Sequence, residues 1–226
     1  MEWCFEWAAY FLSNWKFLEV LEYLSSLSVL VAVLFYFSES GDRTKQKHYQ
    51  AWQVVNTAQG KGGSGGRLEA LQELNADGVQ LVGVDVSGAF LQGIRLEGAR
   101  LLRSNFSAAD LRNSDFRLAD FSDANLHSAN LRDSTLEGAR FQDADLGDTD
   151  LTGADLRNAL MSNADLSESD WTGARLDKAD LRNTNMQDVR WQHLASIQNA
   201  NLSGVKNAPD GLLAWALKNG AVVGGS

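Results

Sequence analysis

The sequence has few of the residues that usually carry catalysis or covalent cross-links. It contains one cysteine, Cys4, so no disulfide can form within the chain, and a reducing compartment is indicated for most of it. Its three histidines, His48, His127 and His193, include no two that are spaced as a pair of metal ligands. The composition therefore predicts a protein that is not an enzyme and that binds no cofactor or metal.

Proline and positive charge are also scarce. The single proline, Pro209, lies near the C-terminus. Lysine and arginine number 20 against 29 aspartates and glutamates, which gives a net charge of −9. Binding to nucleic acid through its phosphates requires a basic stripe, so we expect no direct nucleic-acid partner. A partner with a basic surface remains compatible with this charge.

The sequence is rich in one repeat. From Leu81 to Trp191 every fifth residue is apolar, without exception, and two residues before each of them lies a mostly small residue. Aspartate or asparagine recurs between the two, as in Ala-Asp-Leu at 109–111 and 179–181. A period of five fits neither a helix nor a simple strand. The backbone must instead turn a corner every five residues and bring the same positions inward each time.

This motif, Ala-(Asp/Asn)-Leu-X-X, resembles that of the pentapeptide-repeat family over roughly residues 79–205. The resemblance implies an all-β solenoid, a right-handed quadrilateral β-helix with four pentapeptides per coil. Residues twenty apart would then stack, so Phe121 should lie over Phe141 and Trp171 over Trp191. At about 4.8 Å per coil, the expected six or so coils form a rod about 30 Å long.

The rest of the chain divides around these repeats. Because a solenoid must cover its open ends, helical segments next to the repeats are expected to be caps. After Trp191 the register slips by one residue, with Ala195 and Ala200 predicted at the small position. The expected segments are a membrane-anchoring helix at 1–38, an amphipathic juxtamembrane helix at 39–59, a Gly-rich linker at 60–66, an N-terminal cap helix at 67–78, the β-helix at 79–205, and a C-terminal cap helix with a tail at 206–226.

The N-terminal segment is predicted to cross a membrane. Residues 24–38 carry no charge, and extension back to 17 gives the length that a bilayer requires. The positive residues that follow this run place the repeats on the cytoplasmic side of a single-pass protein, with membrane lipid as a partner. The expected interfacial anchors and intramembrane acids are Trp3, Trp7, Trp15, Glu19 and Glu22. The two glutamates either line a pore or an oligomer contact, or lie at the level of the headgroups.

The glycine-rich stretch 60–67 raises the question of a phosphate-binding loop, since glycines allow backbone amides to surround an anion. The P-loop spacing is absent, because no Gly-Lys-Ser/Thr closes the stretch and no apolar strand precedes it. A flexible linker is the favoured interpretation.

Charge on the outward positions is directional. Sorting them by their place in the coil gives one face without lysine or arginine, whose acidic residues are Asp85, Asp145, Asp148, Asp165, Glu168 and Asp188. The favoured function is a membrane-anchored scaffold or docking module. One alternative, implied by the family resemblance, is a DNA-mimicking inhibitor of gyrase, although duplex DNA carries about one charge per 1.7 Å and this face far fewer. The other is a multimeric pore built from the N-terminal helices. A homo-oligomer could form through either terminal helix.

Overall fold

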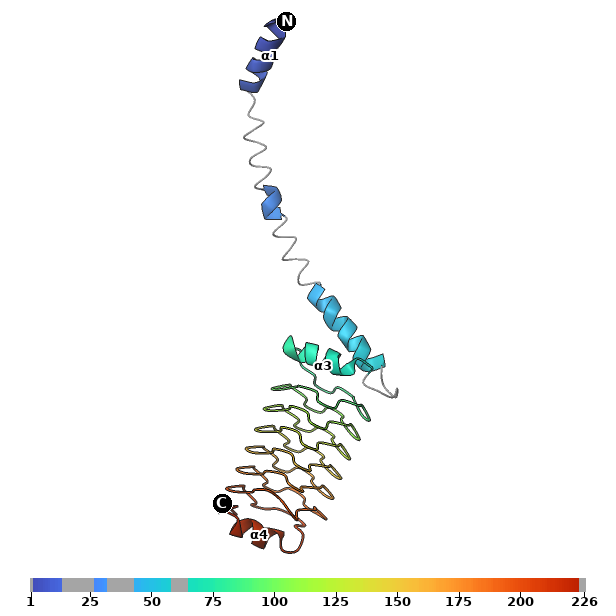
Figure 1. The fold of residues 1–226 in the computed structure, drawn as a ribbon, viewed down its shortest axis with the longest axis vertical. Coiled ribbons are helices and arrows are strands. Elements are labelled where there is room, and N and C mark those ends of the chain that lie inside the picture. The colour runs from blue at the N-terminus through green and yellow to red at the C-terminus, as the bar shows by residue number, and fades with distance from the viewer. Residues whose placement is uncertain (1, 14–26, 32–42, 58–64, 224–226) are drawn as a thin grey trace. The chain divides into compact units, whose positions relative to one another are not determined.

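The computed structural model describes residues 2–13, 27–31, 43–57 and 65–223 (Figure 1). The chain divides into two compact units, Met1–Tyr49 and Gln50–Ser226. The first unit contains helix α1, Glu2–Ser13, and a helical stretch at 27–31. A further helical stretch covers 43–57. The helices of the second unit are α3, Arg67–Ala76, and α4, Leu212–Lys218.

The predicted membrane location requires correction. Within the described residues, none of the helices combines the length and the apolar character that a bilayer crossing requires. This finding contradicts the prediction of a single-pass membrane protein with a cytoplasmic repeat domain. Trp15, Glu19, Glu22 and most of the proposed span at 17–38 lie outside the described residues. Trp3 and Trp7 belong to α1, where both side chains are exposed.

The repeats form a solenoid whose coils contain twenty residues. Parallel β-bridges join each residue of one column to the residue twenty positions further on, as Asp85 to Asn105 and Asn105 to Asn125. The amide of Phe121 donates to the carbonyl of Arg140 at 2.7 Å, and the amide of Asn125 donates to that of Ser104 at 2.9 Å. The coils therefore satisfy one another's main-chain groups, and the predicted solenoid of about six coils is confirmed. Figure 1 shows the coils stacked between α3 and α4.

The interior is filled by the two residue series that repeat every five positions. Leu111 and Leu131 are both fully buried, as are their counterparts along the rod. Phe121 lies flat on Phe141, with ring centroids 5.2 Å apart and an interplanar angle of 4°, as predicted. Each buried large side chain contributes about 1.5–3 kcal/mol, so the repeat is the main source of stability.

Polar residues at the small position are satisfied inside the core. The hydroxyl of Ser104 donates to the carbonyl of Leu101 at 2.6 Å, and Thr149 makes the same bond to Leu146 at 2.7 Å. The indole N–H of buried Trp171 donates to the hydroxyl of Ser169 at 2.8 Å. Serine and threonine therefore replace alanine here without leaving an unpaired hydroxyl.

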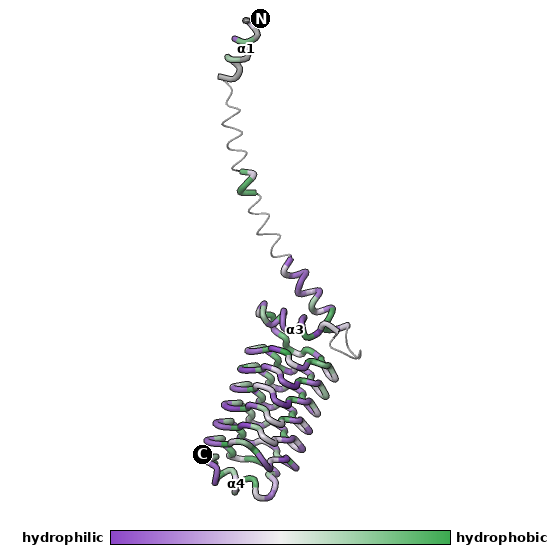
Figure 2. Tube along the Cα trace, in the orientation of Figure 1, coloured by the Kyte–Doolittle hydropathy of each residue, from purple (hydrophilic) through white to green (hydrophobic). Residues whose placement is uncertain are grey.

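Each corner of a coil is a turn with one residue in the left-handed region. The amide of the small residue bonds the carbonyl of the preceding central residue, as Ala109 to Phe106 at 3.0 Å. Two outward residues lie between them, and the second, such as Ala108, has a positive φ in every repeat. Glycine, asparagine and aspartate recur at this position, because they tolerate a positive φ better than other residues. Figure 2 shows hydrophilic residues at these corners and hydrophobic ones along the intervening stretches.

The predicted position of the register slip was wrong by one residue. Leu194, not Ala195, occupies the small position after Trp191 and is buried, whereas Ala195 is exposed. Arg175 is then bridged to Ser196, a separation of 21 residues. The turn 191–194 forms normally, since His193 takes the positive-φ conformation at 74°, so the extra residue is accommodated only after it.

Helices cover both ends of the coils. Leu71 and Leu74 of α3 are buried against the first coil, together with Ala51 and Val55 from the end of the 43–57 helix. At the other end, Trp215 of α4 contacts Trp191, with ring centroids 5.5 Å apart. Trp191 is therefore covered by a cap residue, while Trp171 is buried one coil earlier.

Candidate interaction surface

Two adjacent columns of side chains build the predicted acidic face, which we define as Asp85, Asp145, Asp148, Asp165, Glu168 and Asp188. The first column consists of residues joined by bridges across the coils: Asp85, Asn105, Asn125, Asp145, Asp165, Asn185 and Lys206. The second consists of positive-φ turn residues and contains Asp148, Glu168 and Asp188 at twenty-residue intervals. The solenoid thus concentrates the acids on the coils nearest the C-terminus, with Lys206 at the end of the first column.

The carboxylates of this face bond mainly to neutral donors. Ser128 donates to Asp148 at 2.9 Å, and the amide of Gly147 donates to Asp145 at 2.9 Å. A basic group close to these carboxylates is His127, whose Nδ1 lies 3.5 Å from Asp145 Oδ1. Across the part of the chain that the structure describes, no lysine or arginine forms an ion pair with Asp145, Asp148, Asp165, Glu168 or Asp188.

Asp165 is held in its charged form. Burial acts to raise its pKa, but hydrogen bonds from Ser167 and Asn185 outweigh burial and hold the pKa below the ordinary value. The side-chain amide of Asn185 lies 2.9 Å from Asp165 Oδ1. The face therefore stays negative well into the acid range at this position.

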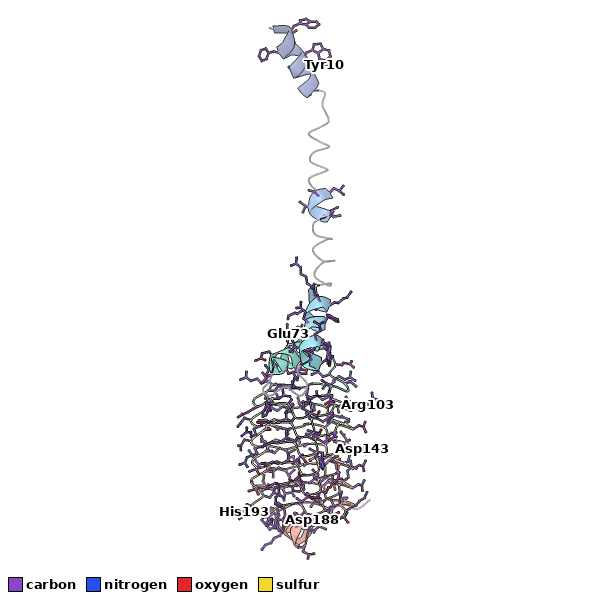
Figure 3. The ribbon with its side chains drawn as sticks, turned by 90° about the vertical axis from the view of Figure 1, so that its right-hand side faces the viewer. Tyr10, Glu73, Arg103, Asp143, Asp188 and His193 are labelled. Carbon is purple, nitrogen blue, oxygen red and sulfur yellow. The ribbon has the colours of Figure 1, made fainter. Side chains whose placement is uncertain are left out.

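The structure extends the negative surface beyond the predicted residues. The turn that precedes the first column places Asp123 and Asp143 at positive φ, and Asp143 lies two residues before Asp145. Figure 3 labels Asp143 and Asp188 among the outward side chains of the coils, with Arg103 at the same edge as Asp143. The five-residue spacing could have identified both aspartates, because their column immediately precedes that of Asp145.

On the other faces many of the acids form ion pairs with arginine. Four repeats carry an Asp-apolar-Arg sequence in which the arginine folds back on the aspartate of its own repeat, with N–O distances of 2.6–2.7 Å: Asp110–Arg112, Asp115–Arg117, Asp155–Arg157 and Asp180–Arg182. The hydrogen bond from the arginine is the largest influence on each aspartate and lowers its pKa. The pKa of each arginine is raised in turn.

A charge ladder runs across the coils on the opposite side. Glutamate and arginine alternate in one column, Glu97, Arg117, Glu137 and Arg157. Arg117 is 3.1 Å from Glu97, and Arg157 is 3.3 Å from Glu137. Because each arginine also bonds the aspartate of its own repeat, this side carries paired charges where the acidic face carries like charges.

One hollow of the surface is lined mainly by polar groups. It has a volume of about 550 Å³ and lies between α3 and the charge ladder, and its lining includes Gln72, Asn75 and Arg95. Gln72 Oε1 accepts from the amide of Arg95 at 2.8 Å, and Asn75 donates to the carbonyl of Glu97 at 3.1 Å. These groups attach the cap to the first coil. Among the described residues, no three His, Cys, Asp or Glu side chains are placed to hold a metal ion.

Comparisons with known proteins agree with this architecture. The model of the pentapeptide repeats matches the chain in eight copies, at residues 80–117, 119–158 and 159–190. Rfr23, a pentapeptide repeat protein from the cyanobacterium Cyanothece 51142, is 29% identical over 44% of this chain and 62% of its own, with a TM-score of 0.34. The chain thus spans less than two thirds of Rfr23.

Two further structures are similar to the chain. HetL, a pentapeptide repeat protein involved in heterocyst differentiation regulation from Nostoc sp. strain PCC 7120, is 31% identical over 56% of this chain and 67% of its own, with a TM-score of 0.29. QnrB1, a plasmid-mediated fluoroquinolone resistance protein, is 19% identical over 63% of this chain and 86% of its own, with a TM-score of 0.23. No curated protein matches the sequence.

Proposed function

Since the chain belongs to the pentapeptide-repeat family, we propose that it is a non-catalytic docking protein whose acidic face binds a basic surface on a partner protein. The observation that carries the proposal is the distribution of ion pairs. Nine acids on the other faces have arginine partners at 2.6–3.7 Å, whereas Asp148, Glu168 and Asp188 stack in consecutive coils without one among the described residues.

Like charges in the first column of the acidic face work against stability. Asp145 is bridged directly to Asp165, so two like charges lie opposite each other on neighbouring coils. Such pairs are destabilising, by an amount similar to the gain of about 0.2–1 kcal/mol from opposite charges. The charge ladder shows that the same backbone accepts alternating signs at twenty-residue intervals. Asp150 and Asp170 also lie opposite each other, but each has an arginine partner. The acidic face, where Asp145 and Asp165 have none among the described residues, is therefore suited to receive positive charge from outside.

A partner with lysines or arginines on a flat or extended surface fits this geometry. Successive coils present carboxylates about 4.8 Å apart, and the fixed backbone holds them without a further loss of chain entropy. Complementary potentials of this kind accelerate encounter and select the partner, more than they raise intrinsic affinity. The charge spacing is too sparse for an imitation of duplex DNA, which carries about one charge per 1.7 Å.

A pair of matched triple variants tests the proposal. The first replaces the unpaired column: Asp148→Asn, Glu168→Gln and Asp188→Asn. The control removes three acids from the column of the charge ladder: Glu97→Gln, Glu137→Gln and Asp177→Asn. Both variants lose the same net charge from different faces, and the control also removes the ion pairs of Glu97 and Glu137.

Binding of fluorescent poly-L-lysine, measured by anisotropy at two salt concentrations, is the readout. We expect the full-length protein to bind with strong salt dependence, the first variant to bind about tenfold or more weakly, and the control to bind like the unmodified protein. Equal weakening of both variants would show that only net charge matters and would refute a docking role for this face.

A further inference from the structure

Among the described residues, Arg67 has no partner for its charge. It is the first residue of α3, its exposed fraction is 1%, and its Nε and Nη1 atoms are buried without a hydrogen-bond acceptor. In the part of the chain that the structure describes, these are the sole buried side-chain nitrogen or oxygen atoms left unpaired. Burial of an uncompensated guanidinium is strongly unfavourable, and arginines kept in such places have an anionic partner.

The backbone amides in the first turn of α3 are a second set of hydrogen-bond donors near this residue. The N-cap residue of α3 is Gly66, which offers no side-chain acceptor to the first turn. Within the described residues the amides of Arg67, Leu68 and Glu69 therefore have no capping partner, while Ala70 already donates to the carbonyl of Gly66 at 3.0 Å. Side chains in a helix incline toward its N-terminus, so the side chain of Arg67, the first residue of α3, belongs to the same end of the helix as these amides.

Solute can reach this point of the surface. Gly65 and Gly66 are exposed, and Gly66 adopts φ 82°, a conformation that favours glycine. A Cβ at Gly66 would lie 3.3 Å from Val54 Cγ1, so glycine is also required by the close packing of Val54 on one side of this residue. The exposed carboxylate of Glu69 lies in the same first turn and competes for the positive end of the helix.

We propose that the N-terminus of α3 and the guanidinium of Arg67 together bind a phosphate-class oxyanion. The donors suit the ligand, because helix amides and the helix dipole attract phosphate, and a guanidinium can bond two of its oxygens at once. The site needs no P-loop sequence, since the buried arginine supplies the positive charge that the lysine of a P-loop would provide. Free inorganic phosphate and the phosphate monoester of a small molecule share this chemistry.

Thermal unfolding of the full-length protein in inorganic phosphate tests the site, with chloride added to hold ionic strength constant. We expect Tm to rise with the logarithm of phosphate concentration. Arg67→Met should weaken the apparent affinity about 10- to 100-fold, as expected for lost hydrogen bonds to a charged group. Arg100→Met, which removes an exposed arginine, should keep the response of the unmodified protein.

Two further measurements keep the test decisive if Arg67→Met fails to fold. Glu69→Gln removes the competing carboxylate, so it should bind phosphate more tightly than the unmodified protein. A parallel series with phenyl phosphate identifies the source, because a larger shift than that from inorganic phosphate indicates a monoester. The proposal is overturned if phosphate leaves Tm unchanged, if Arg67→Met responds like the unmodified protein, or if Glu69→Gln binds no more tightly.

Discussion

Removal of Phe121 should show how much of the stability resides in the aromatic centre of the rod. The ring is fully buried and lies 5.5, 5.2 and 5.2 Å from those of Phe106, Phe116 and Phe141. Phe121→Ala should lower the free energy of unfolding by about 3–5 kcal/mol. Urea denaturation followed by far-ultraviolet circular dichroism measures this change, because unfolding of the coils removes the β signal.

A double-mutant cycle separates the ring stack from simple burial. Phe121 and Phe141 lie parallel in adjacent coils, so their coupling energy should be about 0.5–1.5 kcal/mol. Leu181 lies three coils from Phe121 in the same inward column, and Leu181→Ala should be additive with Phe121→Ala within about 0.5 kcal/mol. A loss below about 1 kcal/mol for Phe121→Ala, or coupling to Leu181 as large as to Phe141, would refute this account of the core.

Three other predictions concern the turns, the ion pairs and the core. Leu118→Asn should raise Tm, because an exposed leucine at φ 58° is strained by about 1–2 kcal/mol and asparagine tolerates that conformation; a lower Tm would contradict this. The bond from Arg157 lowers the pKa of Asp155, so its stabilisation is complete above the ordinary pKa of 3.8 and is lost as pH falls through the folded-state pKa. A Tm series below pH 5 should therefore decline less in Arg157→Met than in the unmodified protein. Trp171→Phe should cost about 1–3 kcal/mol in urea unfolding, since it removes the donor to the Ser169 hydroxyl; an unchanged midpoint would show that this bond is unimportant.

The apolar period of five was sufficient to predict the core. A residue such as Leu111 or Leu131 is buried because its place in the repeat fixes its direction, whatever its neighbours are. The stack of Phe121 on Phe141 followed from the same arithmetic. The acidic columns were also predictable in position, since outward residues twenty apart must align once the coil length is known.

The predicted membrane span failed for a different reason. It rested on the apolar composition of one run, and composition does not establish that a continuous helix of sufficient length forms. The helices in the described residues do not meet that requirement. The predicted role of Trp3 and Trp7 as interfacial anchors has a similar weakness. Both side chains are exposed, but an exposed aromatic side chain on a short helix does not by itself specify what it contacts.

The sequence by itself determined the architecture of this protein, because a repeated pentapeptide imposes the same local geometry at every step, and those steps add up to a coil. Only the tertiary structure decided which charges are paired. Asp115 and Asp145 occupy the same position of the repeat, yet Arg117 folds onto one and a neutral glycine amide bonds the other. It also decided that Ala195 is the extra residue and that Arg67 is buried without a partner. These outcomes depend on side-chain conformations and on contacts between distant residues, which periodicity does not encode.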